Sequence, residues 1–141
     1  MPTYETKDGA EIYYQVHGEN RDEPNLIFIH GWCSNSRHWN QQSAFFSKSH
    51  RVLSMDRRGM GNSTTPGSGH TTQQHASDIA VIAEMEGFRN SVVVAHAGGG
   101  PVGIAFCHDF PALAASFALV ASAVSAPANL EHPTKPHQHL Y

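Results

Sequence analysis

The sequence is short of charged residues and of long apolar runs, and each shortage excludes a class of protein. Only 15% of the 141 residues are charged, and nine Lys and Arg against twelve Asp and Glu give a net charge of -3. A surface that binds nucleic acid needs a basic surplus to neutralise phosphates, so we expect no nucleic-acid partner. No window approaches the roughly 18 consecutive apolar residues that cross a bilayer, so we expect no membrane partner.

Cysteine is also scarce. The two cysteines, Cys33 and Cys107, form neither the framework of a secreted disulfide-rich protein nor the paired spacing of a zinc site. Residues 1–15 are too polar for the apolar middle of a signal peptide. We therefore expect a cytoplasmic protein with reduced thiols. A chain of this length with 40% hydrophobic residues fits one globular domain.

Hydrophobic runs and turn signals predict an α/β fold. An Asp8-Gly9 turn between two β-branched and aromatic segments predicts an N-terminal β-hairpin. After it, strands are expected at 25–29, 51–55, 91–96 and 116–121, and helices within 38–48, 71–86 and 98–110. Alternating strands and helices are typical of a mostly parallel sheet with flanking helices and right-handed crossovers.

Three loops follow predicted strands, at the sheet edge where open α/β sheets present their ligands. They are His30-Gly31-Trp32-Cys33, Asp56-Arg57-Arg58-Gly59-Met60-Gly61-Asn62-Ser63 and Ala95-His96-Ala97-Gly98-Gly99-Gly100. In the third loop a strand turns directly into a helix, which strains the backbone at the apex and tolerates only small neighbours. We expect Ala97 at that apex, below amides at the positive end of the helix.

Together the three loops resemble those of the α/β-hydrolase superfamily, which carry His-Gly-x, Asp-x-Arg-Gly-x-Gly-x-Ser and small-x-nucleophile-x-Gly in this order. The resemblance runs from Asp8 to about Pro127. It implies that Ala97 stands where the family has a Ser, Asp or Cys nucleophile. It also implies that the backbone amides of Trp32 and Gly98 form an oxyanion hole, and that no cofactor is needed.

The resemblance further implies that the chain stops before the cap and the last strands of the fold. Residues 1–127 would then be the N-terminal part of the core, and residues 128–141 the start of a cap or linker. The triad acid and histidine would follow later strands, in a C-terminal half supplied as a separate or further segment. Without that half, an unpaired sheet edge should make the isolated chain unstable.

The leading functional hypothesis is a hydrolase that cleaves an ester or lactone, a small-molecule substrate, through a serine nucleophile at position 97. The chain as given would be inactive, because the methyl group of Ala97 cannot attack a carbonyl. The alanine is either an engineered replacement or the mark of a chain that lost catalysis, and the intact loops around it favour the first explanation.

Three alternatives remain open. The Gly31-Trp32-Cys33 segment is similar to cofactor-free ring-cleaving dioxygenases on this fold, and Asp56-Arg57-Arg58-Gly59 is similar to haloperoxidases. The third alternative is a receptor that binds a small ligand without chemistry, in which an alanine apex would be natural.

The remaining conspicuous residues have structural interpretations. His30 and His96 are expected to pack against backbone groups rather than react. Asp56 and Arg58 are expected to brace the glycine-rich turn through hydrogen bonds to its backbone. Trp39 is expected in the core, whereas Trp32 fits a pocket wall or the core equally well.

Other histidines and the glycine run are likewise expected to lack a binding role. His50, His70 and His75 look like surface residues, and the spacing of His132, His137 and His139 matches no metal-binding pair on a helix. The run Gly98-Gly99-Gly100 lacks the Lys-Ser or Lys-Thr of a phosphate-binding loop.

Overall fold

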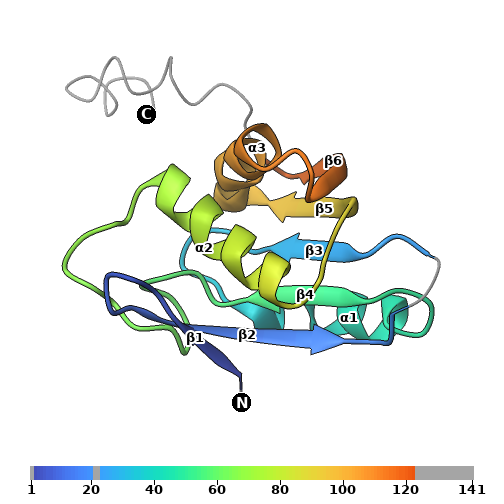
Figure 1. Cartoon of the computed structure of the whole chain (residues 1–141), viewed down its shortest axis with the longest axis horizontal. Helices are drawn as coiled ribbons and strands as arrows, with labels where there is room; N and C mark the ends of the chain where they lie inside the picture. Colours follow the sequence, from blue (N-terminus) through green and yellow to red (C-terminus); the bar gives the residue numbers. More distant parts are fainter. Residues whose placement is uncertain (1, 21–22, 123–141) are drawn as a thin grey trace, which may run out of the picture.

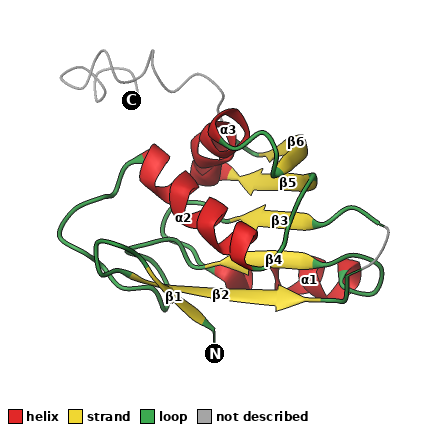
Figure 2. Ribbon diagram, in the orientation of Figure 1, coloured by secondary structure: helices red, strands yellow, loops and turns green. Residues whose placement is uncertain are grey.

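The computed structural model describes residues 2–20 and 23–122, which form a six-stranded sheet with helices on both faces (Figures 1 and 2). The strands are β1 (Thr3–Glu5), β2 (Glu11–His17), β3 (Leu26–Ile29), β4 (Val52–Met55), β5 (Ser91–His96) and β6 (Ala114–Val120). The helices are η1 (Ser36–Trp39), α1 (Asn40–Phe46), α2 (Thr72–Met85), η2 (Ala97–Gly99) and α3 (Gly100–Asp109). Every element expected from the sequence within these residues is present.

The strand order is β1-β2-β4-β3-β5-β6. The pairs β1–β2 and β2–β4 are antiparallel, and the pairs β4–β3, β3–β5 and β5–β6 are parallel. The predicted hairpin and the mostly parallel sheet are therefore confirmed. Because β3 pairs in parallel with both β4 and β5, the loops after these three strands emerge at the same end of the sheet.

The two faces of β3 pack against different layers, as the period of two in a strand requires. Ile27 and Ile29 belong to the larger apolar core, which lies under α2 and α3. Leu26 and Phe28 belong to a smaller cluster on the other face, where Trp39 packs from η1. Burial on both faces explains why this strand is a continuous apolar run in the sequence.

Helix α2 begins where the hydroxyl of Thr71 accepts a hydrogen bond from the N–H of Gln74, at 3.1 Å. It ends before Gly87, whose φ of +73° is a left-handed conformation that glycine adopts without strain. His75, expected at the surface, is buried in this helix. The expectation was wrong because His75 lies one turn before Ile79, on the face that covers the sheet.

Three further expectations concern the sheet edge, membrane-spanning helices and the C-terminal segment. Strand β6 is an edge strand, and its side chains are half-buried or exposed. In the described part of the chain, no helix combines the length and apolar character needed to span a membrane. The segment at 128–141 and its histidines, His132, His137 and His139, lie outside the described residues.

Candidate active site

The connection from β5 to α3 makes the sharp turn expected from the sequence. The strand ends at His96, the short helix η2 starts at Ala97, and α3 starts three residues later at Gly100. Ala97 has a φ of +47°, a left-handed conformation that is costly for a residue with a Cβ. Its side chain therefore stands at the apex of a strained strand-to-helix turn, as predicted.

The loop after β3 approaches this turn closely. In the parallel register Ile29 lies opposite Ala95, so Gly31 and Ala97 extend to the same level beyond the sheet. A Cβ atom at Gly31 would lie 3.2 Å from the Cβ of Ala97. A Cβ atom at Gly98 would lie 3.1 Å from the backbone nitrogen of Trp32. A Cβ atom at either position would be crowded, so the two glycines favour the close meeting of the loops, which brings Ala97, Trp32 and Gly98 together.

The amides of Trp32 and Gly98 have unused hydrogen-bonding capacity. Among the described residues, neither N–H donates a hydrogen bond to a backbone carbonyl outside regular elements. Gly98 lies in the first turn before α3, where amides have no intrahelical acceptor and the helix end carries a partial positive charge. Two such donors beside one side chain are able to hold a negatively charged oxygen.

His30 holds the loop after β3 in place. It is fully buried, and both of its ring nitrogens bond to backbone: Nδ1 donates to the carbonyl oxygen of Gly31 at 2.8 Å, and Nε2 accepts from the N–H of Arg57 at 3.0 Å. Since one partner is an acceptor and the other a donor, only the neutral tautomer with hydrogen on Nδ1 fits. Burial lowers the pKa of His30 to about 4, which agrees with a neutral ring. His30 therefore bonds to backbone groups, as expected from the sequence.

Arg57 is the residue that sequence reasoning missed at this site. Its side chain is buried, and its guanidinium Nη2 donates to the carbonyl oxygen of Gly31 at 2.9 Å. The Nε atom has no hydrogen-bond partner among the described residues. Burial lowers its pKa to about 10. The sequence signal that could have pointed to Arg57 is its place directly after Asp56, in a loop at the same sheet edge as the loops after β3 and β5.

Asp56 braces the loop after β4, as expected. Its Oδ1 accepts from the N–H of Ser36 at 2.7 Å, and its Oδ2 accepts from the N–H of Asn62 at 2.8 Å. A Cβ atom at Gly61 would collide with this carboxylate. Asp56 therefore ties the start of η1 to the glycine-rich turn.

Arg58 does not brace that turn, contrary to expectation. Its guanidinium forms a bidentate pair with Asp78 of α2, at 2.6 and 2.9 Å, and a further ion pair with Asp8 of the hairpin turn, at 2.8 Å. The arginine is fully buried, so carboxylates are better partners than neutral carbonyls. The expectation failed because Asp78 and Asp8 are distant in the sequence.

Comparison with known proteins agrees with this geometry. The family described as the alpha/beta hydrolase fold matches residues 24–139 of the chain. The chain belongs to the alpha/beta hydrolase fold family.

Two curated relatives and one solved structure illustrate the relationship. This hydrolase-fold chain is 43% identical over 96 residues to a bifunctional esterase/perhydrolase of Acinetobacter calcoaceticus, over 67% of the chain and 34% of the relative. It is 39% identical to a non-heme chloroperoxidase of Streptomyces lividans, over 71% of the chain and 36% of the relative. It therefore spans about a third of the length of these relatives.

The solved structure described as Est816, an N-acyl homoserine lactone degrading enzyme, superposes with a TM-score of 0.80. It is 24% identical, and the match covers 94% of this chain and 52% of that one. At this identity the superposition shows the fold alone.

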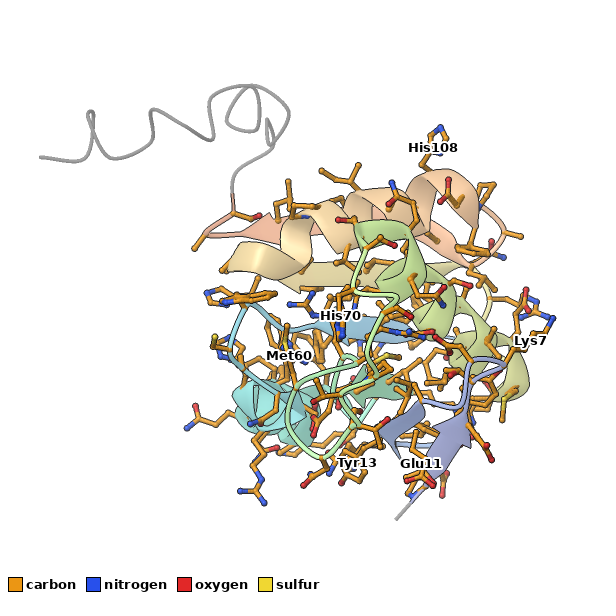
Figure 3. The ribbon with its side chains drawn as sticks, turned by 90° about the vertical axis from the view of Figure 1, so that its left-hand side faces the viewer. Lys7, Glu11, Tyr13, Met60, His70 and His108 are labelled. Atoms are coloured by element: carbon orange, nitrogen blue, oxygen red, sulfur yellow. The ribbon has the colours of Figure 1, made fainter. Side chains whose placement is uncertain are left out.

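A pocket lies beside the amide pair in this hydrolase fold. It has a volume of about 320 Å³ and is lined by Trp32, Cys33, Ser34, Asn35, Gly59, Met60 and Gly61. Met60, labelled in Figure 3, comes from the connection between β4 and α2. Trp32 is 72% exposed, so of its two expected positions it takes the pocket wall and not the core. Trp39 is buried against Phe28, as expected.

His96 packs against two other ring side chains. Its ring stacks on His38, with centroids 4.4 Å apart, and meets Trp39 edge-on. Burial and the neighbouring His96 lower the pKa of His38. In residues 2–20 and 23–122, no group of three or more His, Cys, Asp or Glu is placed to hold a metal ion.

Proposed function

We propose that this chain is the N-terminal part of a hydrolase that cleaves an ester or lactone through a serine at position 97, here replaced by alanine. One observation supports the proposal above the others: the side chain at position 97 stands on a strained turn, with the amides of Trp32 and Gly98 beside it. These groups are the ones that nucleophilic attack on a carbonyl requires.

The proposed reaction starts with a substrate carbonyl in the pocket beside Trp32. A serine oxygen at position 97 would attack the carbonyl carbon and transfer its proton to a histidine base. The carbonyl oxygen would take up negative charge and accept hydrogen bonds from the amides of Trp32 and Gly98. Departure of the alcohol would leave an acyl-enzyme, which water would hydrolyse. With Ala97 the first step has no attacking atom, so the chain as given would bind substrate without turnover.

The names of the relatives support the substrate class in part. The relative from Acinetobacter calcoaceticus is named as an esterase, and another, from Vibrio cholerae, is named as a pimeloyl-[acyl-carrier protein] methyl ester esterase. Because the chain covers about a third of these proteins, we propose that its triad acid and histidine lie in a further part of the fold. Strand β6 offers the sheet edge where that part would pair.

The isolated chain provides a test of that pairing. Light scattering of residues 1–141 should show association or aggregation, because the edge of β6 and its half-exposed side chains would be uncovered. A monomer that unfolds in one cooperative step would contradict the expectation. We propose the cytoplasm as the site of action, since both cysteines are free thiols.

A second candidate is perhydrolysis, in which hydrogen peroxide replaces water in attacking the acyl-enzyme and releases a peracid. It is favoured by the relatives named as a perhydrolase and as non-heme chloroperoxidases. It uses the same nucleophile and the same two amides. The third candidate, a receptor that binds without chemistry, is favoured only by Ala97 itself.

The experiment is an Ala97→Ser substitution in the full-length protein. We expect hydrolysis of short p-nitrophenyl esters or lactones and stoichiometric labelling by a serine-directed phosphonate. Ala121→Ser is the matched control, because Ala121 is also a left-handed alanine, with φ +48°, at the end of a neighbouring strand. No labelling of Ala97→Ser would contradict the hydrolase proposal. Ligand binding without turnover, with alanine at this position in the natural gene, would favour the receptor.

A further inference from the structure

Arg57 is a buried cation that the motifs of the fold do not explain. It occupies the variable position of the Asp-x-Arg-Gly-x-Gly-x-Ser pattern, so the family resemblance assigns it no role. Its side chain is buried, and among the described residues it forms no ion pair with a carboxylate. Its hydrogen-bonding partner is the carbonyl oxygen of Gly31. A buried charge without a counter-charge costs stability, and such groups concentrate at functional sites.

The contacts of the Gly31 carbonyl determine where the next amide points. Its oxygen accepts two hydrogen bonds, from Arg57 Nη2 at 2.9 Å and from His30 Nδ1 at 2.8 Å, which fills both lone pairs. None of the described peptide bonds is cis. In a trans peptide the C=O and the following N–H point in opposite directions. The N–H of Trp32 therefore faces away from Arg57 and His30, on the side where Gly98 makes its close approach.

We propose that Arg57 is a positioning residue for the oxyanion hole. It orients and polarises the Gly31–Trp32 peptide, so that the N–H of Trp32 faces the substrate oxygen held beside position 97. This inference rests on the proposed function, since it names the residue that prepares one of the two donors.

The charge of Arg57 adds to the geometric effect. A guanidinium that donates to a carbonyl oxygen withdraws electron density through the peptide, and the N–H at the other end becomes a stronger donor. A carboxylate partner would cancel this polarisation. The unpaired state of Arg57 is therefore what the role requires. His30 contributes the second bond to the same oxygen but, as a neutral ring, without the charge.

The first test uses the full-length protein with Ala97 in place, so it does not depend on turnover. Arg57→Met removes the charge and the donor but keeps a long apolar side chain suited to a buried site. The amide proton of Trp32 should shift upfield in the ¹H–¹⁵N spectrum, because its own peptide carbonyl loses the charged one of its two hydrogen bonds. Arg57→Lys should recover part of the shift. Arg51→Met is the control, since Arg51 precedes β4 and pairs with Glu86.

An unchanged Trp32 amide in a folded Arg57→Met protein would overturn the proposal. A change of the same size in Arg51→Met would also overturn it, because the effect would then be general. If Arg57→Met does not fold, Arg57→Lys and Arg57→Gln decide the question by the same resonance.

The second test adds Ala97→Ser and measures hydrolysis of a p-nitrophenyl ester. Arg57→Met should lower kcat by at least about tenfold and change KM by less than about twofold, because an oxyanion donor acts on the transition state. Arg57→Lys should restore part of kcat. Equal loss in kcat and binding would indicate a structural role and overturn the proposal. If Ala97→Ser alone gives no turnover, the proposed function fails, while the amide shift still decides the role of Arg57.

Discussion

The two sides of the loop after β4 are held by consecutive arginines in opposite ways. Arg57 lies on the side of the amide pair, with a single carbonyl partner and an unpartnered Nε. Arg58 lies on the side of the hairpin and α2, where Asp78 and Asp8 surround it. Its partners raise the pKa of Arg58, whereas burial lowers the pKa of Arg57 to about 10.

This difference separates a structural use of charge from a functional one. Around Arg58 each hydrogen-bonding nitrogen has a carboxylate partner, so the network joins two distant segments and its charge is neutralised locally. Around Arg57 the charge stays available to the peptide that faces the apex. Removing each arginine should therefore have opposite consequences for stability and for chemistry.

The largest effect on stability is expected from Arg58→Met. It would leave the buried carboxylate of Asp78 without its bidentate partner and free the hairpin turn at Asp8. We expect a loss of about 3–5 kcal/mol in the free energy of unfolding, as for other broken buried ion pairs. Urea titration of the full-length protein measures this loss. A loss below that of Arg57→Met would remove the contrast between the two sides.

A smaller loss is expected from Asp56→Ala, because Asp56 precedes both arginines and supports the turn by hydrogen bonds. The N–H groups of Ser36 and Asn62 would lose a charged acceptor. We expect the free energy of unfolding to fall by about 2–3 kcal/mol. Thermal unfolding followed by circular dichroism provides the measurement. No change would mean that water replaces both bonds.

The pH dependence of stability should distinguish the buried histidines from the ion pairs of Arg58. Burial lowers the pKa of His30 and of His75 to about 4, from 6.5 in the unfolded chain. Below pH 6.5 the unfolded state binds protons that the folded state does not bind. The contribution of the two histidines to stability is therefore complete above pH 6.5 and is lost progressively down to pH 4. At pH 5 each histidine accounts for about 2 kcal/mol.

Arg58 lowers the pKa of Asp8, so the contribution of this ion pair is complete above the unfolded value of 3.8 and is lost only at lower pH. His75→Leu should reduce the loss between pH 6.5 and 4 and leave the acid limb unchanged. Urea titrations at pH 7, 5 and 3 separate the two windows. If His75→Leu and the parent protein lose the same stability between pH 7 and 5, His75 is not held neutral in the folded state.

The smallest effect on stability is expected from Arg57→Met, within about 1 kcal/mol of the parent chain. The substitution removes a buried charge that lacks a counter-charge, and His30 still donates to the Gly31 oxygen. Its cost should appear in kcat instead. A loss of stability comparable to that of Arg58→Met would show that Arg57, like Arg58, mainly supports the fold.

Much of the fold followed from local patterns. Continuous apolar runs identified β3, which is buried on both faces, and β5, which is buried on one face and half-buried on the other. The Thr71 cap and Gly87 bounded α2. The position of Ala97 at a tight turn followed from the glycines beside it. These features depend on residues close together in the chain, where hydrogen bonding and steric limits act locally.

The errors share a different origin. His75 was expected at the surface and Arg58 in contact with the turn backbone, and both depend on what packs against them from afar. Asp8 and Asp78 are separated from Arg58 by 50 and 20 residues. No local pattern distinguishes a paired arginine from an unpaired one, so Arg57 and Arg58 look equivalent in the sequence.

The amino-acid order alone thus determined the strand and helix sequence and the bend at position 97, because backbone preference and side-chain periodicity are properties of short segments. Its three loop motifs carried the resemblance to the family. Tertiary structure decided which buried arginine is neutralised by carboxylates and which peptide carbonyl the other arginine contacts. The physical reason is that electrostatic and hydrogen-bonding partners are chosen by distance in space, and the parallel sheet brings together loops that lie far apart along the chain.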